Sequence, residues 1–119
     1  MAKVLIVEDE EVSLRFYASV LNKAGHEVLQ APNGLGVAGM IRAEQPDVLL
    51  TDLVMPDCEG FEMIMALRKE KMGLPIIAMS AHENYLSIVE ELGADFVLHK
   101  PFSETELVQA VAAAVAKPA

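Results

Sequence analysis

Short apolar runs alternate with helix-like segments along the whole chain. The first run, residues 3–7, has the sequence Lys-Val-Leu-Ile-Val, and a continuous apolar stretch of this length is typical of a strand buried on both faces. Similar runs follow, each separated from the next by a segment whose apolar residues recur at spacings of three and four. The predicted strands cover residues 3–7, 27–31, 47–51, 75–80 and 95–98.

Residues that start or stop helices indicate where the segments between the strands begin and end. Gly25, Pro46 and Gly93 are expected to end the first, second and fourth helices, because glycine and proline terminate helices readily. Ser103 with Glu106 forms a capping box that starts the last helix. The predicted helices cover residues 11–24, the stretch from Asn33-Gly34 to Pro46, residues 59–71, the segment ending at Gly93, and the segment starting at Ser103.

The apolar spacing also predicts which side of a helix faces the core. The residues expected to point inward are Phe16, Tyr17, Val20, Leu21 and Ala24 in the first helix, Tyr85, Ile88, Val89 and Leu92 in the fourth, and Leu107, Val111, Ala114 and Val115 in the last. Regular alternation of strands and helices predicts a parallel sheet covered by helices, which is an α/β fold.

The chain has 119 residues, which fits one domain spanning residues 1–119. With 53% hydrophobic residues it can bury a substantial core. We find no linker, repeat or low-complexity segment, and the tail from Ala116 to Ala119 is too short to be an output domain. We therefore expect a single domain without an attached effector.

The charge balance narrows the choice of partners. The formal net charge of −9 repels nucleic-acid phosphates and anionic lipid headgroups, so neither nucleic acid nor membrane is an expected partner. The single cysteine, Cys58, cannot form an internal disulfide, and no apolar run is long enough to span a bilayer. These features, with an N-terminus unlike a signal peptide, favour a cytoplasmic location.

Polar residues follow the ends of several predicted strands. In an open α/β sheet, sites form beyond the carboxyl ends of the strands. Residues 8 and 9 follow the first strand as Glu-Asp, and Asp52, Ser80 and Lys100 stand at the ends of the third, fourth and fifth. The fold should therefore bring together three carboxylates, one hydroxyl and one ammonium that are mostly distant in sequence.

This set of groups suits metal-assisted phosphoryl chemistry. Carboxylates held close together repel one another, and a hard cation such as Mg²⁺, which prefers oxygen ligands, relieves that repulsion. A carboxylate can attack phosphorus to give an aspartyl phosphate, while a metal ion and a lysine stabilise charge on the transferred oxygens. A serine hydroxyl can hydrogen-bond to the product.

Each residue also has an ordinary structural explanation. The acidic run from Glu8 to Glu11 favours a helix N-terminus through the helix dipole, and Asp52 suits a turn after a strand. Ser80 can be a plain strand-end hydroxyl and Lys100 a solvated surface lysine. The convergence of all of them at one edge favours the functional interpretation. For His82, near Ser80, we prefer a solvent-facing loop position.

The same residues make the chain resemble response-regulator receiver domains over essentially its whole length. Any one of the shared motifs is weak evidence, but together and in the family's order they are highly specific. The motifs are residues 4–10 for the opening strand and acidic pair, 52–60 for the phosphoacceptor loop, Ser80-Ala81 for the switch hydroxyl, and 93–95 with 100–102 for the closing motif.

The resemblance implies a (βα)5 flavodoxin-like fold with strand order 2-1-3-4-5. It implies that Asp52 accepts a phosphoryl group, with Lys100 contacting that group and Ser80 sensing it. Mg²⁺ would be held by Asp9, Asp52 and the backbone carbonyl of Val54, with Glu8 in the same set either directly or through water. The bond between Lys100 and Pro101 would be cis. Such a protein is a self-phosphorylating and self-dephosphorylating switch more than an enzyme with a separate substrate.

The resemblance also implies partners. A sensor histidine kinase or a histidine phosphotransfer protein would donate the phosphoryl group and dock on the first helix, where Leu14 and Ala18 are candidate contacts or, with similar weight, incidental exposed residues. A downstream protein would bind the face formed by the helix after Ser80, the strand over 95–98 and the last helix.

Two positions depart from the family pattern. Glu8 stands where the family often has aspartate. Val97 stands where the family usually has tyrosine or phenylalanine, and Phe96 beside it should point to the opposite face of the sheet. We therefore expect phosphorylation to be read out differently, through the start of the helix after Ser80.

Two other functions were weighed. A receiver-like interaction module that is never phosphorylated is favoured by Val97 but disfavoured by the full set of site residues. A phosphohydrolase with an aspartyl phosphate would need a second acid two residues after the nucleophile, where this chain has Val54. It would also usually need a cap domain, for which there is no room.

Overall fold

A single parallel sheet organises the computed structural model of the chain, which describes residues 1–53 and 60–116. Within those residues the sheet has five strands in the order β2-β1-β3-β4-β5. Both the parallel α/β architecture and the predicted strand order are confirmed. The strands are β1 (Lys3–Val7), β2 (Glu27–Ala31), β3 (Val48–Asp52), β4 (Ile76–Ser80) and β5 (Phe96–His99).

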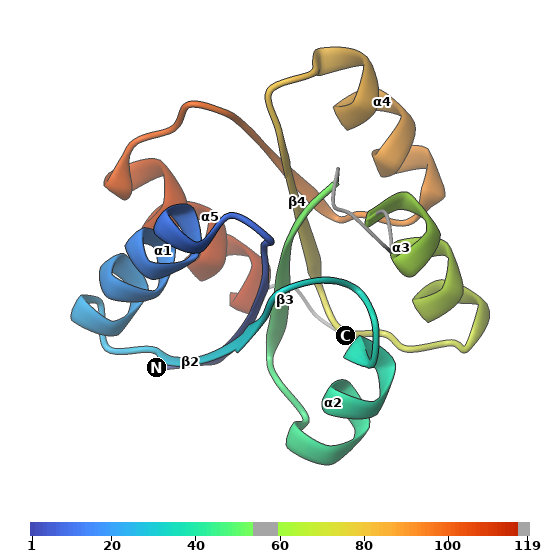
Figure 1. The fold of residues 1–119 in the computed structure, drawn as a ribbon, viewed down its shortest axis with the longest axis horizontal. Coiled ribbons are helices and arrows are strands. Elements are labelled where there is room, and N and C mark those ends of the chain that lie inside the picture. The colour runs from blue at the N-terminus through green and yellow to red at the C-terminus, as the bar shows by residue number, and fades with distance from the viewer. Residues whose placement is uncertain (54–59, 117–119) are drawn as a thin grey trace.

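Helices cover both faces of this sheet. Figure 1 shows α1 and α5 packed together on one side, while α2, α3 and α4 lie on the other. In the described part of the chain, no helix combines the length and the apolar character needed to cross a membrane. The helices are α1 (Glu11–Lys23), α2 (Val37–Glu44), α3 (Gly60–Lys69), α4 (Glu83–Leu92) and α5 (Glu104–Ala116).

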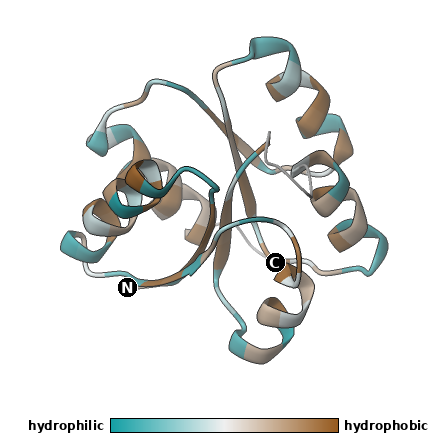
Figure 2. Cartoon of the chain, viewed as in Figure 1, coloured by the Kyte–Doolittle hydropathy of each residue, from teal (hydrophilic) through white to brown (hydrophobic). Residues whose placement is uncertain are grey.

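The core consists of two apolar layers separated by the sheet. Along β1, Val4 and Ile6 join the layer under α1 and α5, whereas Leu5 and Val7 join the layer under the other helices. All four side chains are fully buried. Two-sided burial explains why β1, β3 and β4 are mostly apolar, and Figure 2 shows this apolar centre.

Most helix boundaries follow the predicted signals. The Ser103 Oγ accepts a hydrogen bond from the Glu106 N–H, and the Glu106 carboxylate accepts one from the Ser103 N–H, both at 3.0 Å, so the capping box is confirmed. Gly93, with φ 127°, ends α4 as expected. The start of α2 is different, because Asn33 forms a turn through its side chain and the helix begins only at Val37, after Gly36.

In several helices the face that points toward the core differs from the predicted face by part of a helical turn. Phe16 is 45% exposed and Ala24 is exposed, while Ala18, expected outside, is buried. These helices carry apolar residues on adjacent stripes, and one residue rotates the direction by about 100°. The contact with the sheet, which sequence spacing does not show, selects the stripe. The other predicted inward residues that are exposed are Tyr85, Ile88 and Val115.

Candidate functional site

Parallel pairing brings the predicted polar residues to one edge of the sheet. The registers Val7 with Thr51, Asp52 with Met79, and Ser80 with His99 align the carboxyl ends of four strands. Glu8 and Asp9 therefore follow β1 beside the end of β3, and Lys100 follows β5 beside the end of β4. The predicted convergence is confirmed for the residues at the ends of β1, β3 and β5, whose side chains interact directly.

Lys100 bridges two carboxylates. Its Nζ lies 3.1 Å from Glu8 Oε1 and 3.3 Å from Asp52 Oδ2. The Glu8 side chain is 1% exposed, against 14% for Asp52 and 24% for Lys100. A buried carboxylate needs such a partner, because an unpaired buried charge is very unfavourable. The ammonium thus holds Glu8 and Asp52 on the same side of the site.

The site contains more carboxylates than ammonium groups. Glu8, Asp9 and Asp52 each offer an oxygen atom, and these atoms lie within 4.8 Å of one another. Asp9 is exposed, so the group opens to solvent on one side. We call Glu8, Asp9, Asp52 and Lys100 the acidic site. Its oxygen ligands and residual negative charge fit a hard divalent cation such as Mg²⁺.

The crowding changes the ionisation of two groups. The pKa of Glu8 is raised to about 7, mainly because its carboxyl is buried and also because of the charge of Asp52, while Lys100 opposes the shift. Burial disfavours the charge on Lys100, but Asp52 and Glu8 outweigh that effect, and the pKa of Lys100 is raised. The lysine therefore stays charged, while Glu8 titrates near neutral pH.

Ser80 occupies the end of β4. Its side chain is 3% exposed, and its Oγ accepts a hydrogen bond of 3.0 Å from the N–H of His82. The N–H of Lys100 donates to the Ser80 carbonyl at 2.9 Å, which fixes the two chain segments together. The hydroxyl is therefore coupled to the residue that caps α4.

The backbone around Asp52 is tightly held. Asp52 Oδ1 accepts a hydrogen bond of 2.7 Å from the Leu53 N–H, and the Gly60 N–H donates to the Leu53 carbonyl at 2.9 Å. A Cβ atom at Gly60 would lie 2.4 Å from the Asp52 carbonyl oxygen, so only glycine fits where α3 starts. Within the predicted phosphoacceptor loop, residues 54–59, which include Val54 and Cys58, lie outside the described residues.

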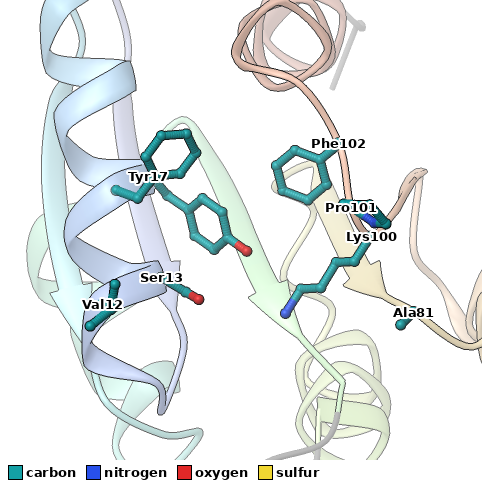
Figure 3. Close-up of a pocket in the computed structure, with 8 residues that line it drawn as sticks. Val12, Ser13, Tyr17, Ala81, Lys100, Pro101 and Phe102 are labelled. Carbon is teal, nitrogen blue, oxygen red and sulfur yellow. The ribbon is translucent and has the colours of Figure 1, made fainter.

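A pocket of about 480 Å³ adjoins the site between α1 and the segments after β4 and β5. Figure 3 shows the hydroxyl of Tyr17 and the ammonium of Lys100 pointing toward one another across it. Sequence reasoning assigned Tyr17 only to the core. The remaining lining residues are mostly apolar: Val12, Ser13, Phe16, Ala81, Pro101 and Phe102.

Two further expectations hold. The peptide bond between Lys100 and Pro101 is cis. Phe96 packs against the core layer of α1 and α5, whereas Val97 packs against the other layer, so the two side chains lie on opposite faces of the sheet.

Comparisons with known proteins agree with this geometry. The family model described as response regulator receiver domain matches residues 4–112. The chain is 35% identical to PilH of Pseudomonas aeruginosa over 98% of its own length and 99% of PilH. It is 31% identical to the transcriptional regulator NtrC of Rhizobium meliloti, also over 98% of its length, but spans only 25% of NtrC.

Solved structures give the same result. The receiver domain of the Francisella response regulator 1452 superposes with a TM-score of 0.89 at 28% identity, covering 97% of both chains. TrrA of Thermotoga maritima, solved in complex with Mg²⁺ and BeF, has a TM-score of 0.86 at 28% identity, covering 95% of this chain and 98% of TrrA. From its sequence, its strand order and the acidic group at the end of β3, this chain belongs to the family of response regulator receiver domains.

Proposed function

We propose that this domain is a signalling switch that accepts a phosphoryl group on Asp52. The observation that carries the proposal is the joint presence, at one sheet edge, of three carboxylates with mutually close oxygen atoms and a lysine bound to two of them. The Mg²⁺–BeF complex of the related TrrA supports a site for a phosphoryl-like group in this fold.

The chemical step moves a phosphoryl group from an oxygen or nitrogen atom of the donor to a carboxylate oxygen of Asp52. A carboxylate oxygen of Asp52 attacks the phosphorus atom of the donor and forms a P–O bond. The bond from phosphorus to the donor breaks, and the donor group keeps the electron pair. In a separate, slow deactivation, a water molecule attacks phosphorus, the P–O bond to Asp52 breaks, and inorganic phosphate leaves while the Asp52 carboxylate keeps the electron pair.

The residues of the acidic site divide the work. Asp9 and Asp52 would hold Mg²⁺ together with the Val54 carbonyl predicted from the sequence. Glu8 would contribute directly or through water. When bound, the cation neutralises charge on the phosphoryl oxygens and the carboxylates. Lys100 already contacts Asp52 and would transfer that contact to a phosphoryl oxygen, which favours the charge that develops there.

Ser80 would report the new group. Its Oγ now accepts the His82 N–H, and a hydrogen bond from the Ser80 hydroxyl to a phosphoryl oxygen would draw this pair toward Asp52. Because His82 immediately precedes α4, the change reaches the start of that helix. The output surface for a downstream protein would be the face of α4, β5 and α5.

The phosphoryl donor would be a histidine kinase or a phosphotransfer protein docking on α1. Leu14 and Ala18 are no longer the best contacts, because Ala18 is buried and Leu14 packs against the core. Val12 is 73% exposed and Phe16 is 45% exposed, and both line the pocket beside Lys100. These two residues are the better candidates for the docking surface.

The test is the intact mass of the protein after incubation with acetyl phosphate, with and without Mg²⁺, beside Asp52→Asn. We expect one phosphoryl adduct that requires Mg²⁺ and is absent from the variant. If acetyl phosphate fails, a phospho-histidine protein is tried as donor. No adduct from either donor, in a protein that binds Mg²⁺, would overturn the proposal and favour a module that acts without phosphorylation.

A further inference from the structure

Tyr17 is a polar residue on the buried side of α1. It is 7% exposed, and its ring stacks on Phe102 with centroids 5.4 Å apart and an interplanar angle of 27°. The Phe16 ring also contacts the Tyr17 ring edge-on, with centroids 6.0 Å apart. These contacts fix the ring, so its hydroxyl has a defined position, facing Lys100 across the pocket (Figure 3). A phenylalanine would satisfy the packing equally well, so the hydroxyl requires its own explanation.

Ser13 is a polar neighbour of this hydroxyl on α1. Its side chain lines the same pocket as Tyr17 and Lys100, and its Oγ donates a hydrogen bond of 2.6 Å to the Glu10 carboxylate, which uses the single hydroxyl proton of Ser13. Ser13 therefore has no proton left to donate to the Tyr17 oxygen, and a donor to that oxygen must come from elsewhere around the pocket.

Lys100 is the donor that this oxygen faces. An ammonium group has three N–H donors, and Glu8 and Asp52 accept two of them. Burial raises the pKa of Tyr17, Lys100 lowers it, and Glu8 and Asp52 raise it, so the hydroxyl lies within electrostatic reach of all three groups. The third donor of Lys100 and the lone pairs of Tyr17 are therefore complementary.

From this geometry we infer that the Tyr17 hydroxyl is a positioning group for Lys100, and holds its ammonium at the acidic site during phosphoryl transfer. The inference rests on the proposed function of Asp52. The flexible four-carbon stem of a lysine loses precision easily, and transfer is sensitive to the placement of the stabilising charge. Tyr17 acts through Lys100 and does not itself touch the phosphoryl group.

The first test is a double-mutant cycle on the rate constant of Mg²⁺-dependent phosphorylation by acetyl phosphate. Tyr17→Phe keeps the ring stack on Phe102 and removes only the oxygen. We expect it to slow phosphorylation about tenfold when Lys100 is present and to have no further effect in a Lys100→Met background. Tyr85→Phe is the matched control, because it removes the chain's other phenol hydroxyl, on a ring that packs against Phe61.

The second test needs no phosphorylation. The order parameter of the Lys100 Cε methylene, measured by ¹³C NMR relaxation, should fall in Tyr17→Phe but not in Tyr85→Phe. An equal slowing of phosphorylation in both Lys100 backgrounds, or an unchanged Lys100 order parameter in Tyr17→Phe, would overturn the positioning role. If the wild-type protein takes no phosphoryl group from any donor, the proposed function fails instead, while the order parameter still decides whether Tyr17 holds Lys100.

Discussion

The acidic site lies at the carboxyl ends of the strands, whereas a second charged cluster lies at their amino ends. The second cluster joins Arg68, in the last turn of α3, to Asp95, immediately before β5, and we call it the arginine clamp. The acidic site has three carboxylates around one ammonium, whereas the clamp has one charge of each sign. The two clusters therefore use similar residue types for different purposes.

Most donors of the clamp arginine are used in hydrogen bonds. The Arg68 guanidinium donates to the carbonyls of Gly93, Met72 and Leu74, and lies 2.8 Å from Asp95 Oδ2. That carboxylate oxygen also accepts the Ile76 N–H at 2.9 Å. The clamp therefore ties the end of α3 to the starts of β4 and β5, and contributes to stability. In the acidic site three carboxylates face one ammonium, and this excess of negative charge opposes folding.

The largest effect is expected from breaking the clamp. Arg68→Met should lower the free energy of unfolding by about 3 kcal/mol, because three carbonyls and a partly buried carboxylate lose their donor. Urea unfolding measures this. Arg15→Met is the control, since its pair with Glu11 is exposed on α1 and should change stability by less than about 0.5 kcal/mol. Equal losses in the two variants would show that the clamp is not structural.

The second effect is a pH dependence that belongs to the acidic site alone. The pKa of Glu8 is about 7 in the folded chain against 4.5 for an ordinary glutamate, so the folded state binds more protons than the unfolded state between these values. Stability should therefore fall by about 2 kcal/mol as the pH rises from about 4.5 to 7 without Mg²⁺. Glu8→Gln should remove this slope in urea unfolding measured at each pH. The same slope in Glu8→Gln would assign it to another group.

The smallest effect is a gain of stability on removing a charge. Asp52→Asn leaves Lys100 paired with Glu8, so the inner pair becomes balanced. We expect the unfolding free energy to rise by about 1 kcal/mol without Mg²⁺, and the thermal stabilisation by added Mg²⁺ to shrink. Differential scanning calorimetry with and without Mg²⁺ checks both expectations. A loss of stability in this variant would mean that Asp52 is held as firmly as the clamp carboxylate.

The sequence was most informative where the periodicity is simple. Apolar runs located all the strands, and parallel order alone brought Glu8, Asp52 and Lys100 together. It failed at helix faces such as that of Phe16, where adjacent apolar stripes compete and only tertiary contact decides. It also missed the clamp, because the partners of Arg68 are largely backbone carbonyls, which no residue type reveals.

The close approach of Gly60 to the Asp52 carbonyl has a consequence for protein engineering. A single methyl group there would press on the backbone that carries Asp52, so even alanine would displace it. Libraries built to change the lifetime of the proposed phosphorylated state should therefore leave position 60 fixed. Diversity is better placed on exposed positions of α1 away from the pocket, such as Arg15, where new side chains would leave that backbone undisturbed.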